Sequence, residues 1–348
     1  MNALYICQNA IGDIITSLPS IHFLKEKCKD ISLDICVSES YADVFLADIH
    51  INSVIAVPKE WYGMNTVLPT IDIVSRFTKH YDLVVDIMCI PQTAELIKKI
   101  HPEKAIGIGF DDVVHAYDDY LPQEQWAAWD NGDRTASYCF ADIVQLYTKE
   151  CSLKDPELYI TEKAQKQGRE WMEKNNPKQR LVIALNPGAG NEAKRWPMLN
   201  FIELARELKE REFLPLFIFG PKESFLFQRY SENLAKTGSL IFHSEIFSIQ
   251  PLAGILNQCG LVISNDCAVM HVSAAIGRPT IGIFGPSYSK IWFPYSRKKN
   301  RVIERNVPCR KNCRGVCSHF SCLTEIHLKE VLQTSLELLD LSIDEIDR

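Results

Sequence analysis

The stretch that decides the fold of this chain is Leu261–Pro286, with the sequence LVISNDCAVMHVSAAIGRPTIGIFGP. It begins with an apolar strand, Leu261–Ser264, and ends with a second one, Thr280–Phe284. Between them, Ala268–Ile276 carries the small residues of a helix that approaches a sheet closely, and Gly277 ends that helix. A strand, a helix and a strand in this order predict a βαβ unit whose helix N-terminus lies at the carboxyl edge of a parallel sheet.

The turn between the first strand and the helix carries Asp266, and His271 follows five residues later in the sequence. The unpaired N–H groups and the partial positive charge of a helix N-terminus favour bound phosphate. A turn that only connects two elements needs neither side chain, so we interpret this one as a phosphate site. One more structural unit of an α/β sheet is the alternative reading of the same pattern.

Composition limits the class of protein. The 348 residues suffice for two domains, and 46% apolar and 24% charged residues are typical of a globular protein. A net charge of −6 argues against a nucleic-acid-binding protein, and no apolar run is long enough to predict a transmembrane helix. The N-terminus lacks a basic segment and has Asp13 within its apolar part, so we expect no signal peptide. We therefore expect a cytoplasmic protein, which can still contact a membrane surface.

The N-terminal half opens with the strand Ala3–Cys7, a loop containing Gly12, and a helix from about Ile14 to Lys27. Neither the dinucleotide fingerprint nor the P-loop pattern is present. Asp13 stands at the start of this helix, where ligands bind in such sheets, although a carboxylate there also stabilises the helix dipole. Strands and helices then alternate, with predicted helices over 67–79 and Glu162–Asn175 among them, except in 110–133, which shows no clear period.

This alternation restarts in the second half, with a predicted strand over Leu214–Phe219 and a predicted helix over 225–237 among its elements. We therefore predict an α/β chain with two Rossmann-like, doubly wound domains facing a central cleft. The predicted domains are 1–165 and 166–325, followed by a C-terminal helix over 326–348 that packs back on the first domain.

Several loops of the second half follow predicted strands and therefore converge on one edge of the sheet. Gly188 allows close approach of the backbone to a ligand, Lys194 can neutralise a phosphate, and Glu223 can accept from a ribose. Each has a structural alternative: Lys194 as a solvated cation, Glu223 as a first-turn carboxylate, His271 as a half-buried imidazole. Their joint placement favours the ligand site.

Three segments carry a family resemblance: NAIGDIITSLPSIHFLK, LNPGAGNEAKRWPMLNFIELARELKER and SNDCAVMHVSAAIGRPTIGIFGPS. Together they resemble glycosyltransferase family 9, the ADP-heptose heptosyltransferases of lipopolysaccharide core assembly, which have the GT-B fold. The resemblance implies that Asp13 is the general base of an inverting transfer, with ADP as leaving group. It implies ADP-heptose as donor substrate, a lipopolysaccharide core acceptor, and no required cofactor or metal.

The resemblance also implies roles within the donor-binding set. Lys194 holds the donor phosphates, Glu223 lies at the ribose, and the backbone of Phe247 lies by the adenine. With Gly188, the expected donor-binding residues are Lys194, Glu223, Phe247, Asp266, Cys267, Ala268 and His271. The family's usual turn is Asp-Thr/Ser-Gly, and here it is Asp266-Cys267-Ala268. An alanine disfavours a positive φ at that position.

Twelve cysteines are many for such a chain, and four of them lie together. The candidate metal ligands of this cluster are Cys309, Cys313, Cys317 and Cys322. A bound metal, a reduced structural loop and a disulfide all fit this spacing. Three functions remain open: heptose transfer to lipopolysaccharide, a family relative with another donor or acceptor such as a protein heptosyltransferase, and a non-catalytic nucleotide-sugar-binding protein.

Overall fold

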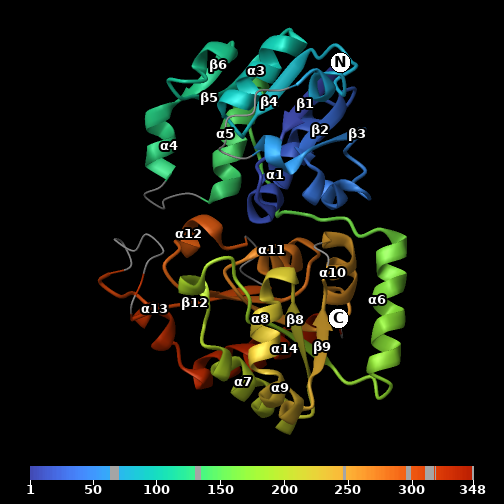
Figure 1. Cartoon of the computed structure of the whole chain (residues 1–348), viewed down its shortest axis with the longest axis vertical. Coiled ribbons are helices and arrows are strands. Elements are labelled where there is room, and N and C mark those ends of the chain that lie inside the picture. Colours follow the sequence, from blue (N-terminus) through green and yellow to red (C-terminus); the bar gives the residue numbers. More distant parts are fainter. Residues whose placement is uncertain are drawn as a thin grey trace. The chain divides into compact units, whose positions relative to one another are not determined.

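The computed structural model describes residues 1–62, 70–129, 135–245, 248–294, 299–309, 317 and 319–346. The chain divides into two compact units, unit 1 from Met1 to Tyr159 and unit 2 from Ile160 to Arg348 (Figure 1). The predicted boundary at residue 165 falls inside helix α6, Glu162–Asn175, which unit 2 contains whole.

Unit 1 holds a sheet of six described strands in the order β3-β2-β1-β4-β5-β6, and every neighbouring pair is parallel. The strands are β1 (Asn2–Ile6), β2 (Ser32–Ser38), β3 (Ser53–Val57), β4 (Leu83–Asp86), β5 (Ala105–Gly109) and β6 (Asp119–Pro122). The α-helices are α1 (Ile11–Lys27), α2 (Ile71–Val74), α3 (Pro91–Ile100), α4 (Gln123–Trp129) and α5 (Ala136–Thr148). The 3-10 helices are η1 (Glu39–Phe45), η2 (Lys59–Tyr62) and η3 (Val114–Ala116).

Unit 2 repeats this design with six described parallel strands in the order β12-β11-β10-β7-β8-β9. The strands are β7 (Val182–Asn186), β8 (Leu214–Phe219), β9 (Leu240–His243), β10 (Leu261–Asn265), β11 (Thr280–Phe284) and β12 (Asn300–Glu304). After α6, the helices are η4 (Glu192–Lys194), α7 (Met198–Glu210), η5 (Pro221–Glu223), α8 (Ser224–Arg229), α9 (Ser231–Thr237), α10 (Ile249–Leu256), α11 (Ala268–Ala275), α12 (Ser289–Trp292), α13 (Ser321–Thr324) and α14 (Leu328–Ile346).

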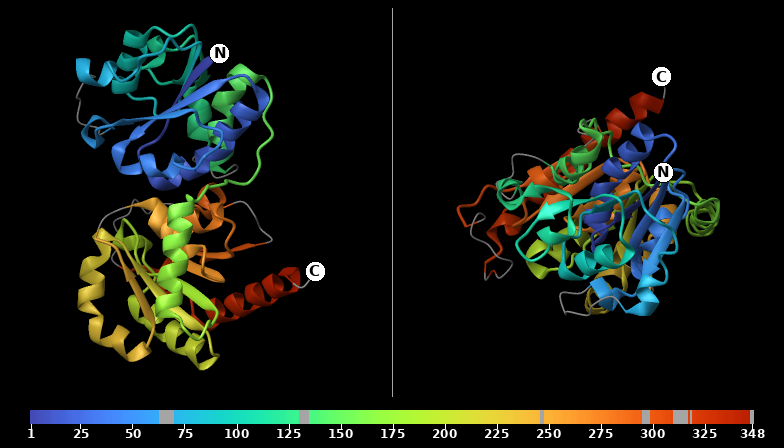
Figure 2. Two further views of the ribbon diagram at one scale, coloured as in Figure 1. Left: turned by 90° about the vertical axis from the view of Figure 1, so that its right-hand side faces the viewer. Right: turned by 90° about the horizontal axis from the view of Figure 1, so that it is seen from above.

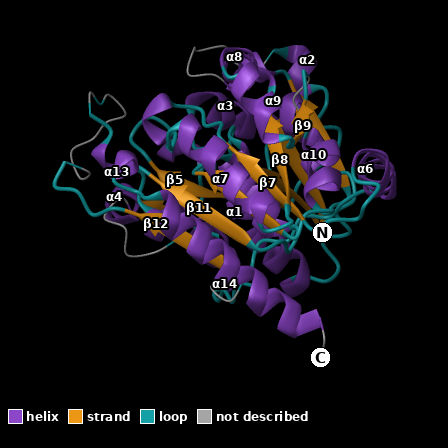
Figure 3. Cartoon of the chain, turned by 90° about the horizontal axis from the view of Figure 1, so that it is seen from below, coloured by secondary structure: helices purple, strands orange, loops and turns teal. Residues whose placement is uncertain are grey.

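The central strands are buried along their whole length, as expected where helices cover a parallel sheet. Figure 3 shows helices, in purple, flanking the strands. These observations confirm the predicted α/β class with two doubly wound, Rossmann-like sheets. No helix among the described residues combines the length and apolarity that crossing a membrane requires.

The last helix, α14, belongs to the core of unit 2. Val331 and Leu338 are buried in the same cluster as Trp196 and Phe201 of the α7 region. Figure 2 shows α14 as one continuous helix at the end of the chain, in red. Helix α14 lies within the predicted range 326–348, and its described apolar side chains pack in the core of unit 2; the packing of this helix on the first domain stays a prediction.

Candidate functional site

The site of unit 2 is built on neighbouring strands. In the sheet, β7 lies between β10 and β8, with Asn186 of β7 paired with Ser264 of β10. All three strands run parallel, so the loops that follow them leave the same edge. The structure thereby brings the segments of Lys194, Glu223 and Asp266 to one edge, as the sequence predicts.

Lys194 and Asp266 form an ion pair at this edge. Lys194 Nζ donates to Asp266 Oδ2 at 2.8 Å. The lysine side chain is 36% exposed, whereas the aspartate side chain is only 5% exposed. Lys194 ends the short helix η4, and the Asn191 side chain caps that helix by accepting from the Ala193 N–H at 2.9 Å. The pair therefore presents an accessible ammonium group on a buried, fixed carboxylate.

Two asparagines that sequence analysis did not single out join the loops. Asn265 Nδ2 donates to the Pro187 carbonyl at 2.9 Å, and Asn265 Oδ1 accepts from the Trp196 N–H at 3.0 Å. Asn186 Nδ2 lies 2.9 Å from Cys267 Sγ and 3.0 Å from Ser264 Oγ. The sequence contained a signal for both, because each is a polar last residue of a mainly apolar strand.

His271 is buried in α11 at 4% exposure. Burial, aided by the positive charge of Lys194, lowers the pKa of His271 to about 4, and the Asp266 carboxylate opposes this shift. The imidazole is therefore neutral at pH 7. Within the group of Lys194, Asp266 and His271, the lysine supplies the positive charge.

The unusual Cys267-Ala268 turn has an ordinary backbone. Cys267 is extended, with φ −162° and ψ −178°, and occupies the N-cap position of α11 without a side-chain capping hydrogen bond. Ala268 is the first residue of that helix and is not one of the described non-glycine residues with positive φ. The alanine therefore adopts its turn without strain. Burial raises the pKa of the Cys267 thiol, so the thiol is protonated at pH 7.

The side chain of Glu223 leaves little room for a side chain at position 188, which is a glycine. A Cβ built at Gly188 would lie 2.6 Å from Glu223 Cγ, whereas a Cβ at Gly190 meets nothing within 4 Å. Glu223 Oε2 accepts from the Gly220 N–H at 3.2 Å. Burial raises the pKa of the Glu223 carboxyl. The close approach of the two loops places Glu223 directly beside the backbone of the β7 loop.

Asp13 lies in unit 1, in the first turn of α1 and just beyond the carboxyl end of β1. It is half-buried, and its backbone carbonyl accepts from Thr16 Oγ1 at 3.0 Å. Phe247 and Cys313 lie outside the described residues. Of the remaining cluster, Cys322 is buried and Cys309 and Cys317 are half-buried. No disulfide joins the described cysteines.

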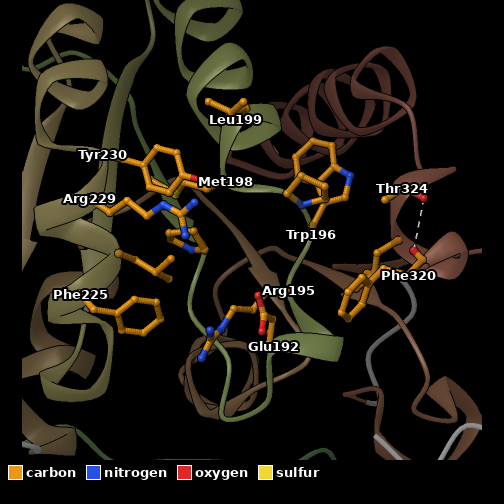
Figure 4. Close-up of a pocket in the computed structure, with 14 residues that line it drawn as sticks. Glu192, Arg195, Trp196, Met198, Leu199, Phe225, Arg229, Tyr230, Phe320 and Thr324 are labelled. Carbon is orange, nitrogen blue, oxygen red and sulfur yellow. Dashed lines mark hydrogen bonds between the residues drawn. The ribbon is translucent and has the colours of Figure 1, made fainter. Parts of the chain in front are cut away.

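A separate pocket of about 260 Å³ lies between α7, α8 and α13 of unit 2 (Figure 4). Its lining includes Trp196, Phe225 and Phe320, and the Arg195 guanidinium lies 5.1 Å from the centre of the Phe225 ring. The pocket touches the β7 loop at Pro187 but contains none of the predicted donor-binding residues. It therefore does not mark the predicted donor site.

Comparison with known proteins gives a consistent result. The family model described as "Glycosyltransferase family 9 (heptosyltransferase)" matches residues 125–321. A curated relative, lipooligosaccharide heptosyltransferase 2 of Campylobacter jejuni, is 26% identical over 165 residues, which are 45% of this chain and 51% of that protein. The match spans about half the length of the curated relatives of this kind.

Two solved structures share the fold over nearly the whole chain. A glycosyl transferase family 9 protein from Veillonella parvula has a TM-score of 0.83 at 20% identity, covering 97% of both chains. The Escherichia coli ADP-heptose lps heptosyltransferase II has a TM-score of 0.77 at 18% identity, covering 97% of this chain and 98% of that one. This likeness supports the GT-B architecture of two Rossmann-like units.

Proposed function

This chain belongs to glycosyltransferase family 9, and on that premise we propose that it transfers a heptose from ADP-heptose to a lipopolysaccharide inner-core acceptor. The observation that carries the proposal is the Lys194–Asp266 pair beside neutral His271, at the strand edge where Rossmann-like sheets bind nucleotides. The relatives are named as heptosyltransferases, and one as an ADP-heptose enzyme, which supports this choice of donor and acceptor.

Unit 2 supplies the donor site in this proposal. Lys194 and the N-terminus of α11 provide positive charge for the pyrophosphate and for the ADP that leaves. Asp266 holds the ammonium in place before the donor arrives. His271, being neutral, acts as a hydrogen-bonding group. Glu223 and Gly188 lie together on the adjoining loop, where a carboxylate suits ribose hydroxyls.

Unit 1 supplies the base. The acceptor hydroxyl attacks the anomeric carbon, its proton passes to the Asp13 carboxylate, and the bond from that carbon to the phosphate oxygen breaks to release ADP. One direct displacement inverts the anomeric centre. The half-buried position of Asp13 at a helix N-terminus supports this role, because the helix dipole stabilises the carboxylate form. A lipid-bound acceptor would bring the enzyme to the membrane surface.

Direct turnover tests the function. Purified protein is incubated with ADP-heptose and a core acceptor that lacks heptose, and the mass of the product is measured by mass spectrometry. We expect the acceptor to gain one heptose for each ADP released. Binding of ADP without any transfer would support a non-catalytic nucleotide-sugar-binding protein instead. Transfer only from another donor, or only to a protein, would support a different member of the family.

A further inference from the structure

Unit 1 contains a cluster of metal-ligand side chains remote from Asp13. His22 of α1 places Nε2 2.8 Å from Asp48 Oδ2, and His50 places Nδ1 3.0 Å from Asp48 Oδ1. Asp48 and His50 lie in the segment between η1 and β3. The three ligand atoms lie within 4.8 Å of one another. The side chains are only 10%, 3% and 15% exposed for His22, Asp48 and His50.

The arrangement is that of a converging ligand set. The two imidazole rings stack, with centroids 4.2 Å apart and 24° between their planes, and each directs one nitrogen to the same carboxylate. The His50 backbone N–H also donates to Asp48 Oδ1 at 2.9 Å, which orients the carboxylate. Outer hydrogen bonds of this kind orient the ligands of metal sites.

We propose that His22, Asp48 and His50 bind one Zn²⁺ ion. Two imidazole nitrogens and one carboxylate oxygen are preferred zinc ligands, whereas Mg²⁺ prefers oxygen alone. Zinc bonds of about 2.0–2.1 Å in a tetrahedron hold ligand atoms roughly 3.4 Å apart. The 2.8 and 3.0 Å contacts reach the two different oxygens of the Asp48 carboxylate, and the three ligand atoms lie within 4.8 Å of one another, so the side chains must rotate to draw these atoms together around the ion. A water molecule completes the four ligands.

The proposed zinc site lies away from the proposed base. His22 and Asp13 are nine residues apart on α1, which at about 1.5 Å per residue separates them by roughly 14 Å. The ion therefore cannot contact an acceptor hydroxyl that is held at Asp13. It joins the C-terminal half of α1 to the segment before β3. The ring of Tyr159, the last residue of unit 1, lies 6.0 and 5.9 Å from the His22 and His50 rings.

Substitution with glutamine separates a zinc site from a hydrogen-bonded group, because a glutamine amide can still donate to Asp48 but is a poor zinc ligand. The matched control is His80→Gln. His80 lies in a second group with Asp82 and Glu103, but its side chain is 62% exposed. Wild type, His22→Gln, His50→Gln and His80→Gln are titrated with Zn²⁺ against a chromophoric chelator, after circular dichroism shows that each is folded.

We expect wild type and His80→Gln to bind one more equivalent of Zn²⁺ than His22→Gln and His50→Gln. Zinc bound by the cysteines is the same in all four proteins, so it cancels when their stoichiometries are compared. Zn²⁺, but not Mg²⁺, should also raise the Tm of the first two proteins and leave that of the other two unchanged. Equal zinc stoichiometry in all four proteins, or no zinc bound by wild type, would overturn the proposal. Neither readout uses ADP or an acceptor, so the result is independent of the proposed transfer.

Discussion

Lys194 Nζ lies 2.8 Å from Asp266 Oδ2, and this contact joins the loops that follow two neighbouring parallel strands, β7 and β10. The carboxylate is almost fully buried, while the ammonium is one-third exposed. A phosphate that enters this edge of the sheet can therefore reach the lysine without displacing the aspartate. In the proposed donor site, the buried aspartate would position the cation for the anionic ligand.

Replacing Lys194 with alanine should weaken ADP binding by about tenfold or more, the loss expected for one charge-assisted contact to phosphate. Isothermal titration calorimetry measures the affinity. Lys178→Ala removes an exposed lysine of the same unit and serves as control, with unchanged affinity expected. Equal ADP affinity in Lys194→Ala and wild type would remove Lys194 from the donor site.

Gly188→Ala should weaken ADP binding several-fold, because the new methyl group would lie 2.6 Å from Glu223 Cγ and must push that side chain away. Gly190→Ala is the matched control two residues later, where a Cβ has open space. Both variants are compared by calorimetry and thermal unfolding. If the two bind ADP alike, Glu223 does not act in nucleotide binding.

Ala268→Gly restores the glycine that the family resemblance leads one to expect at this turn. Ala268 is already helical, so we expect ADP affinity to stay within about twofold of wild type. Glycine in the first turn should lower the free energy of unfolding by about 0.5–1 kcal/mol. Calorimetry and denaturant titration measure the two effects. A tenfold gain in affinity would show instead that the alanine methyl group obstructs the donor.

His271 should make stability depend on pH. Its pKa is about 4 in the folded protein and 6.5 when unperturbed, so the unfolded chain binds more protons between these values. The free energy of unfolding therefore falls as the pH drops from 6.5 towards 4, by about 3 kcal/mol at most, and His271 contributes no slope above that window. Urea unfolding at several pH values should show a shallower decline for His271→Gln. Identical profiles for the two proteins would contradict the neutral, buried imidazole.

Much of the fold could be predicted from the sequence. Strand β8, strand β11 and helix α6 have the bounds that their apolar periods and flanking turn residues predict. The strands that the sequence did not predict lie in segments with mixed polarity. β6 lies in 110–133, where its short sequence DYLP carries no alternating pattern, and β12 has polar residues along its length and was not predicted.

Two predicted helices also differ from the structure. The helix expected over 225–237 is two helices, α8 and α9, that meet at Tyr230. Of the helix expected over 67–79, the described part forms only the single turn α2.

The site could be predicted in part. Polar residues after apolar strands indicated the loops of Lys194, Glu223 and Asp266, because parallel strands end at one edge. The linking roles of Asn186 and Asn265 depend on the neighbouring order of β7 and β10, which the local pattern does not contain. The His22–Asp48–His50 cluster was missed for the same reason, since its members come from a helix and a distant loop.

The central claim is that Asp13 is the base of a heptosyl transfer. The most direct test is turnover with ADP-heptose and a heptose-free core acceptor in Asp13→Asn, with Asp30→Asn, an exposed aspartate beyond α1, as control. We predict that Asp13→Asn lowers kcat by about 10²–10⁴-fold while ADP binding is retained, and that Asp30→Asn matches wild type. A kcat for Asp13→Asn equal to that of wild type would contradict the account.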